Sequence, residues 1–177
     1  DGMKVDDFSA FFHENWEKIV LKLREGRYRP SPVRQCQIPK GNGEFRTLGI
    51  PTVLDRVIQQ AIAQLIGPSY DSKFSDSSHG YRPQRSAQGA MKQLLNFANA
   101  RGTKCMVVDC DLKQFFDTVD HQLMMQKLRQ NITDASLLGL IKRYLKAGAI
   151  TSKGELIASP EGMPQGGPLS PLLANIL

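Results

Sequence analysis

The chain is poor in cysteine, and no two of its cysteines form a CxxC pair. Its 177 residues include three cysteines (Cys36, Cys105 and Cys110) and three scattered histidines. An odd count without paired spacing supports neither a disulfide framework nor a zinc site. Cys105 and Cys110 lie in or beside an apolar run, so we expect them to be packing thiols.

Long apolar runs are also missing. No stretch approaches the roughly 20 apolar residues that span a bilayer, and no signal-peptide pattern opens the chain. The hydrophobic content of 41% and the charged content of 23% are ordinary for a folded protein. We therefore expect no membrane partner and a cytoplasmic location.

Acidic residues are fewer than basic ones, and the net charge is +6. A basic balance favours nucleic acid, an anionic membrane surface or phosphorylated ligands as partners. Between positions 22 and 56, eight Lys/Arg stand against three acids, which accounts for +5 of the net charge. We expect the positive surface to lie in this part of the chain and the remainder to be nearly neutral.

Apolar spacing predicts an α+β fold in which helices pack on small antiparallel sheets or hairpins. Pro51 suits the first position of a helix, and Gly67-Pro68 suits its end. The predicted helices cover 6–25, 51–66, 86–100, 121–130 and 135–148, and the predicted hairpins cover 33–50, with its turn at "KGNGE", and 149–162. The helix at 6–25 carries an apolar stripe that we expect to face the core.

A buried strand is predicted over 103–112, "TKCMVVDCDL", and it ends in Asp109 and Asp111. Alternate residues of a strand point to the same face. A carboxylate at the end of a buried strand is costly unless it is paired or bound to a cation, and Mg²⁺ binds such groups together with substrate phosphates. Asp117 and Asp120 follow, and for them helix capping is the competing interpretation.

Four blocks together resemble the reverse transcriptases encoded by bacterial group II introns, also called intron maturases: "IPKGNGEFRTLGIPTVLDRVIQQAI", "HGYRPQRSA", "VVDCDLKQFFDTVDH" and "GMPQGGPLSPLLANIL". The blocks occur in the family's order and cover nearly the whole chain. The resemblance implies a right-hand polymerase with a basic, helical N-terminal extension (1–34), fingers (35–102) and part of a palm (103–177). It also implies RNA-templated DNA synthesis with deoxynucleoside triphosphates as substrates and Mg²⁺ as cofactor.

Within this family the acidic block binds metal and nucleotide. Asp111 matches the first metal-binding aspartate, and the Leu112 carbonyl is expected to join it. Phe116 resembles the aromatic gate that excludes a 2′-hydroxyl, with Phe115 as the alternative. The backbone N–H groups of three residues could cradle phosphate oxygens: Lys113, Gln114 and Phe115.

Two further blocks are expected to contact the nucleotide. Lys40 and Arg46 match the pair that grips the incoming triphosphate. In "PQGGPLSP", Gln165 would touch the ribose or base, and Gly166 would let the backbone approach the nascent pair. Ser170 is expected to cap the helix that begins at Pro171.

The remaining basic residues are expected to hold RNA. In "GYRPQRS", Arg82 and Arg85 would face the template backbone, and Tyr81 would pack or stack; a solvated loop is the alternative. Three arginines of the N-terminal stretch are candidates for phosphate contacts with the template or with intron RNA: Arg27, Arg29 and Arg34. The implied partners are an RNA template, including the intron RNA, and a DNA primer or target.

The family's second catalytic block, Tyr-x-Asp-Asp, does not occur in these 177 residues. The resemblance therefore predicts that the chain alone is an inactive fragment whose exposed apolar surface favours a homodimer. Two alternatives stay open: a role dominated by RNA binding as a splicing cofactor, and a reverse transcriptase of retron, diversity-generating, CRISPR-linked or phage-defence type.

Overall fold

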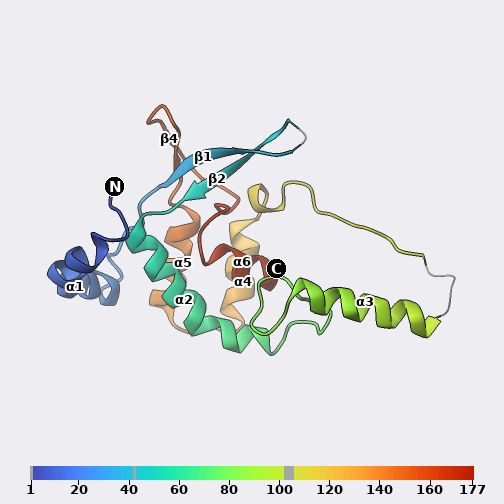
Figure 1. Cartoon of the computed structure of the whole chain (residues 1–177). Helices are drawn as coiled ribbons and strands as arrows, with labels where there is room; N and C mark the ends of the chain where they lie inside the picture. The colour runs from blue at the N-terminus through green and yellow to red at the C-terminus, as the bar shows by residue number, and fades with distance from the viewer. Residues whose placement is uncertain (1, 42, 102–105) are drawn as a thin grey trace.

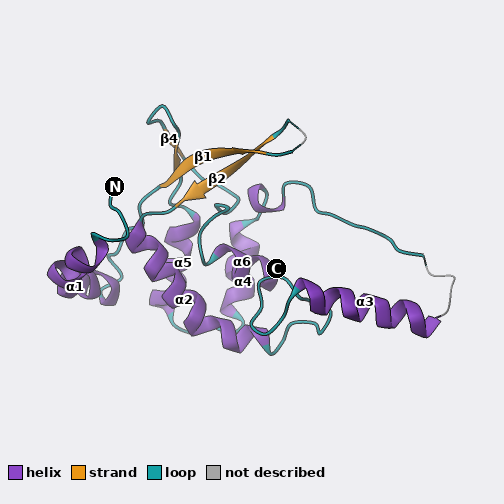
Figure 2. Cartoon of the chain, viewed as in Figure 1, coloured by secondary structure: helices purple, strands orange, loops and turns teal. Residues whose placement is uncertain are grey.

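The computed structural model describes residues 2–41, 43–101 and 106–177 (Figures 1 and 2). Its elements are α1 (Phe8–Arg24), β1 (Val33–Pro39), β2 (Phe45–Ile50), α2 (Val53–Asp71), α3 (Ala87–Arg101), the 3₁₀ turn η1 (Phe115–Asp117), α4 (His121–Arg129), α5 (Ala135–Leu145), β3 (Ala149–Ile150), β4 (Leu156–Ile157) and α6 (Ser170–Ile176). The α+β class is confirmed. The expectation for Cys105, like the turn position Asn42, falls outside the described residues.

The two predicted hairpins form, and they join into one mixed sheet with the strand order β2-β1-β3-β4. β1 and β2 pair antiparallel, with Gln37 opposite Thr47. β3 runs parallel to β1, with Val33 opposite Ala149. The expectation of purely antiparallel pairing is therefore wrong where the two hairpins meet, between β1 and β3. In the sequence, α2 to α5 lie between the two hairpins.

The core lies below this sheet, between α2, α4, α5 and α6 (Figure 1). Met124, Leu128 and Ile141 have no exposed surface. Met124 and Leu128 lie four positions apart on α4, and Ile141 and Leu145 lie four positions apart on α5, as a buried helix face requires. The domain boundaries predicted from the sequence stay a prediction.

Both ends of α2 differ from the prediction. The helix begins at Val53, because the Thr52 side chain caps it by accepting a hydrogen bond from the Asp55 N–H at 3.1 Å. It continues through Gly67-Pro68 to Asp71. Tyr70 explains the extension, because its ring is buried and its hydroxyl donates to the Leu128 carbonyl at 3.1 Å.

The buried strand predicted over 103–112 is wrong for the residues that the structure describes. Residues 106–112 run as an extended segment without strand pairing, and Met106, Val107 and Val108 are 93%, 74% and 78% exposed. A strand becomes buried only when a neighbouring strand supplies hydrogen bonds and a layer covers its face. Among the described residues no element does either for this segment.

Two helices expose apolar side chains. On α1, Ile19 is buried as expected, but Trp16 is half-exposed and stacks on Phe12 with ring centroids 4.7 Å apart. α3 projects from the body of the fold (Figure 1) and exposes Met91 and Phe97. Such a surface fits the predicted homodimer, which stays a prediction. No helix within the described ranges is long and apolar enough to span a bilayer.

Candidate nucleotide-binding site

The loop before α6 joins the two blocks that the sequence placed at the site. Backbone hydrogen bonds run from the Gly162 N–H to the Val119 carbonyl at 2.8 Å and from the Met163 N–H to the Phe116 carbonyl at 2.7 Å. Two residues later, the Gln165 carbonyl accepts a hydrogen bond from the Gly49 N–H at 2.7 Å. The "PQGG" loop is thereby fixed between the hairpin β1–β2 and the turn η1.

Gly166 allows the close approach of this loop to β2. Its φ is +123°, and a Cβ at this position would lie 2.8 Å from the Gly49 carbonyl oxygen. Any other residue would combine an unfavourable backbone conformation with a clash against main chain. The close approach in the structure is to β2, and the expectation that Gly166 lets the backbone approach the nascent pair stays a prediction.

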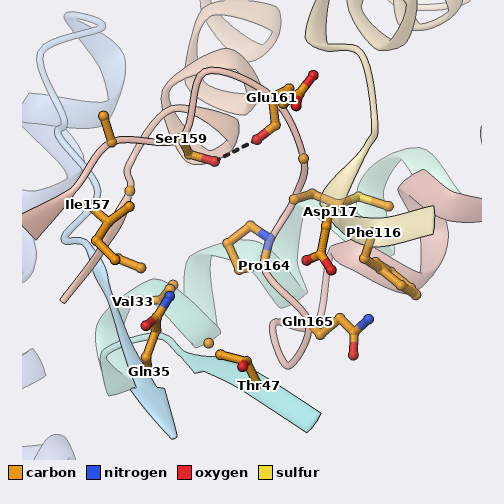
Figure 3. Close-up of a pocket in the computed structure, with 16 residues that line it drawn as sticks. Val33, Gln35, Thr47, Phe116, Asp117, Ile157, Ser159, Glu161, Pro164 and Gln165 are labelled. Carbon is orange, nitrogen blue, oxygen red and sulfur yellow. Dashed lines mark hydrogen bonds between the residues drawn. The ribbon is translucent and has the colours of Figure 1, made fainter. Parts of the chain in front are cut away.

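A hollow of about 170 Å³ opens between the hairpin and the loop (Figure 3). Gln165, Phe116 and Asp117 line it on one side, and Gln35 and Thr47 line it on the other. The structure therefore brings together two of the predicted nucleotide-binding side chains, Gln165 and Phe116.

Gln35 and Thr47 were missed by sequence reasoning, as was Asp117, for which capping was the alternative. A signal existed for the first two. Val33 and Gly49 are the buried positions of the hairpin, so positions two residues away on each strand lie on the same face. The hairpin register could have placed Gln35 and Thr47 toward the loop.

Of the two candidate gate residues, only Phe116 lines the hollow. Both rings are half-buried against the core and meet edge to face, with centroids 5.5 Å apart. Gln114 precedes them with a φ of +54°, in the left-handed region. This reversal turns the chain from the extended segment that holds Lys113 into η1.

Lys40 and Arg46 do not line the hollow. Arg46 lies next to Thr47 on β2, and neighbouring residues of a strand point to opposite faces, so Arg46 lies on the far face of the hairpin. The Lys40 ammonium is 3.0 Å from the Glu44 carboxylate, and both side chains are exposed. An ion pair this exposed contributes at most about 1 kcal/mol, so a polyanionic ligand could compete for Lys40.

Asp111 and Leu112 lie in the exposed extended segment, and neither lines the hollow that Gln165 shares. The described residues contain no group of three His, Cys, Asp or Glu side chains that could hold a metal ion. One exposed carboxylate does not make a two-metal site, which needs ligands for both ions. The described residues by themselves therefore do not fit the Mg²⁺ pair.

Two capping expectations have opposite outcomes. Asp120 caps α4, accepting hydrogen bonds from the N–H groups of Gln122 at 2.6 Å and Leu123 at 2.9 Å. Ser170 does not cap α6. The helix already begins at Ser170, and the Ser170 hydroxyl donates to the Pro164 carbonyl at 2.7 Å.

The structure places the predicted template-binding residues in different environments. The Arg82 side chain is 5% exposed, donates to the Asp71 carboxylate at 2.7 Å, and lies over the ring of Phe74. Arg82 thus holds its own loop together and lowers the pKa of Asp71 through this hydrogen bond. Tyr81 is 81% exposed with a φ of +54°, and Arg85 pairs with the exposed carboxylate of Asp76.

Of the N-terminal arginines, Arg27 pairs with Glu25, whereas Arg34 is exposed on β1, on the face opposite to Gln35. Arg29 lies beside the last turn of α5, where it lines a different hollow.

The comparison with protein families agrees with the resemblance that the four sequence blocks indicated. The model of "Reverse transcriptase (RNA-dependent DNA polymerase)" matches residues 38–177. The chain belongs to the reverse transcriptase family.

Its relatives include group II intron proteins, as the sequence predicted. The chain is 42% identical over its whole length to "Protein YkfC" of Escherichia coli K12, and 40% identical over 99% of its length to the "Group II intron-encoded protein LtrA" of Lactococcus lactis subsp. cremoris. It spans 47% of the first protein and 29% of the second. A solved structure titled "Partial Cas6-RT-Cas1--Cas2 complex" matches 99% of the chain with a TM-score of 0.63 at 25% identity, over 29% of that chain.

Proposed function

We propose that this domain serves RNA-directed DNA synthesis by a group II intron-encoded reverse transcriptase, with deoxynucleoside triphosphates and Mg²⁺. The observation that carries the proposal is the hollow in which Gln165 and Phe116 meet Gln35 and Thr47 of the hairpin. A template-directed polymerase needs a surface that holds the nucleotide between two rigid elements. Here backbone hydrogen bonds fix the loop of Gln165 to both elements.

Each side of the hollow has a distinct part in this proposal. Phe116 forms the wall against the sugar, and Gln165 offers an amide that can donate and accept hydrogen bonds. Lys40 would reach the triphosphate when the hairpin tip bends toward it, and Arg46 would reach it when the hairpin also twists its far face toward the hollow. Asp111 would supply one carboxylate oxygen toward Mg²⁺, and the remaining ligands would come from other parts of the enzyme.

The proposal is tested by primer extension with a chimera in which these 177 residues replace the matched region of LtrA. We expect the chimera to extend a DNA primer on an RNA template. Asp111→Ala should lower extension by about 10²- to 10³-fold, the scale on which enzymes lose rate without one charge-stabilising group, while RNA binding stays within about twofold. Asp76→Ala, at an exposed position, is the control. Extension that survives Asp111→Ala would remove Asp111 from the metal site.

Phe116→Ala in the same chimera tests the gate. We expect ribonucleotide incorporation to rise by about 10- to 100-fold relative to deoxyribonucleotide incorporation, because one contact with a hydroxyl-sized group contributes about 1–3 kcal/mol of discrimination. Phe115→Ala is the matched control, since its ring is likewise half-buried against the core but lies outside the hollow. A larger relaxation in Phe115→Ala than in Phe116→Ala would reverse the assignment.

Intron RNA is the proposed template and partner. The identity to the intron-encoded protein LtrA supports it, as does the match to the "Putative COX1/OXI3 intron 1 protein" of Saccharomyces cerevisiae at 32% identity over 90% of the chain. The CRISPR-linked alternative has its support in the shared fold with the Cas6-RT-Cas1 complex, at lower identity.

A further inference from the structure

Two neighbouring hollows beside α4 and α5 are lined by cations. The first has a volume of about 520 Å³ and the second about 350 Å³, and Lys142 and Lys146 line both. The other cations are Arg29 and Arg143 in the first hollow and Arg129 in the second. We call these five residues the α5 basic surface.

No carboxylate lines either hollow. Among the described residues, no ion pair or side-chain hydrogen bond involves any of the five cations. The Arg143 Nε is buried without a partner. Burial and the nearby charge of Arg29 lower the pKa of Arg143. Like charges held together in this way are unfavourable unless an anion lies between them.

Gly139 lines the first hollow. It lies in the interior of α5, where glycine destabilises a helix relative to alanine. A Cβ at Gly139 would lie 3.4 Å from the Arg143 Nη1 and would fill space at the wall of the hollow. Glycine at this position therefore costs the helix stability and leaves this part of the wall without a side chain.

Helix dipoles explain only part of this arrangement. Basic residues in the last turn of a helix complement its negative end, and Lys142, Arg143 and Arg129 occupy such turns. Arg29 does not, since it lies between α1 and β1. Dipoles also do not explain why no acid lines the hollows.

We propose that the α5 basic surface binds the phosphate backbone of folded RNA, as a contact additional to the template site. The surface extends over two hollows that share Lys142 and Lys146, and its cations come from three segments of the chain, so it offers more charge than one phosphate group needs. Pro160 lines the second hollow, and the adjoining Glu161 and Gly162 line the candidate nucleotide site. RNA held on α5 would thus pass close to that site. The choice of RNA as the anion rests on the proposed function.

The test is binding of a fluorescent RNA hairpin to the 177-residue chain, measured by anisotropy over a series of salt concentrations. Lys142→Glu/Lys146→Glu changes two exposed side chains of the surface, and Lys92→Glu/Lys153→Glu makes the same change in net charge elsewhere. We expect the first variant to bind at least about 10-fold more weakly at 0.1 M salt, with a log–log salt slope shallower by about 1.4–1.8 for two lost phosphate contacts. The control should change affinity less than about threefold. Circular dichroism confirms that both variants fold.

Equal losses in the two variants, or no loss in the first, would overturn the proposal. The proposal would also be overturned if binding to phosphatidylserine vesicles required Lys142 and Lys146 while RNA binding did not. Failure of the proposed function is distinguishable: if the LtrA chimera does not extend primers but hairpin binding still depends on Lys142 and Lys146, the RNA surface stands without the polymerase.

Discussion

Asp55→Ala is expected to destabilise the chain by about 4 kcal/mol, since each buried donor left unpaired costs about 1–3 kcal/mol and such costs are not fully additive. Asp55 is 1% exposed, and it accepts hydrogen bonds from the hydroxyls of Tyr28 at 2.8 Å, Tyr144 at 3.1 Å and Thr52 at 2.8 Å. The Ser31 N–H is a fourth donor, at 3.1 Å. One carboxylate therefore ties the segment after α1 to α2 and α5.

The two tyrosines stay protonated donors at every physiological pH. Burial first, and the charge of Asp55 second, raise the pKa of Tyr28 and of Tyr144 above the ordinary range of tyrosine. Deprotonation therefore does not relieve the network, and the cost of losing Asp55 should be constant between about pH 6 and pH 9.

Urea denaturation followed by circular dichroism measures the effect of Asp55→Ala. Asp55→Asn keeps one acceptor and should lose about half as much stability. Asp76→Ala removes an acid that is 94% exposed and that, within the described ranges, pairs only with Arg85, so it should change stability by less than about 1 kcal/mol. A loss below 1 kcal/mol in Asp55→Ala would mean that water replaces the carboxylate.

Asp55 also shows what the sequence could and could not reveal. From the sequence it counted only as one acid among basic residues. The spacing Thr52-x-x-Asp55 is typical of a reciprocal helix cap, and it could have placed the start of α2 correctly. The two tyrosine partners lie 27 and 89 positions away, and no local pattern predicts contacts at such separations.

Local sequence patterns predicted the individual helices and hairpins well. They predicted poorly which segments pack or pair with one another. Alternation and a glycine-rich turn predicted the β1–β2 hairpin, because both properties reside in a few adjacent residues. The segment 106–112 has a strand's composition, but a strand also needs a partner, which composition does not supply. Arg82 was expected to face RNA, whereas Asp71, eleven residues earlier, pairs with it.

The charge expectation was incomplete for the same reason. The sequence placed the positive surface between positions 22 and 56, where the local surplus lies. Folding brings Arg29 beside Lys142 and Arg143, more than a hundred positions later, and their neighbouring acids lie outside the hollows. A count of charges along the sequence groups residues that the fold places on different surfaces.

Gly162→Ala is expected to destabilise the chain by about 2–5 kcal/mol, the sum of about 1–2 kcal/mol for a left-handed alanine and 1–3 kcal/mol for overpacking. Gly162 has a φ of +79°, and a Cβ there would lie 2.7 Å from the Asp117 carbonyl oxygen. The neighbouring atoms belong to the main chain, so no side chain can rotate away. The hydrogen bond from Gly162 to Val119 would lengthen as the loop shifts.

Gly154→Ala is the matched control, because Gly154 has nearly the same φ, +83°, but nothing within 4 Å of its Cβ position. It should lose only the conformational part, about 1–2 kcal/mol. The difference between the stability losses of the two variants, measured by urea denaturation, gives the steric part.

The shift of the loop in Gly162→Ala also matters for the site, since the adjoining Met163 N–H bonds to the Phe116 carbonyl. In the LtrA chimera, primer extension at a temperature where both variants are folded should therefore fall in Gly162→Ala and persist in Gly154→Ala. Equal stability losses in the two variants would show that the loop does not press against η1, and the account of how Gln165 is positioned beside Phe116 would be wrong.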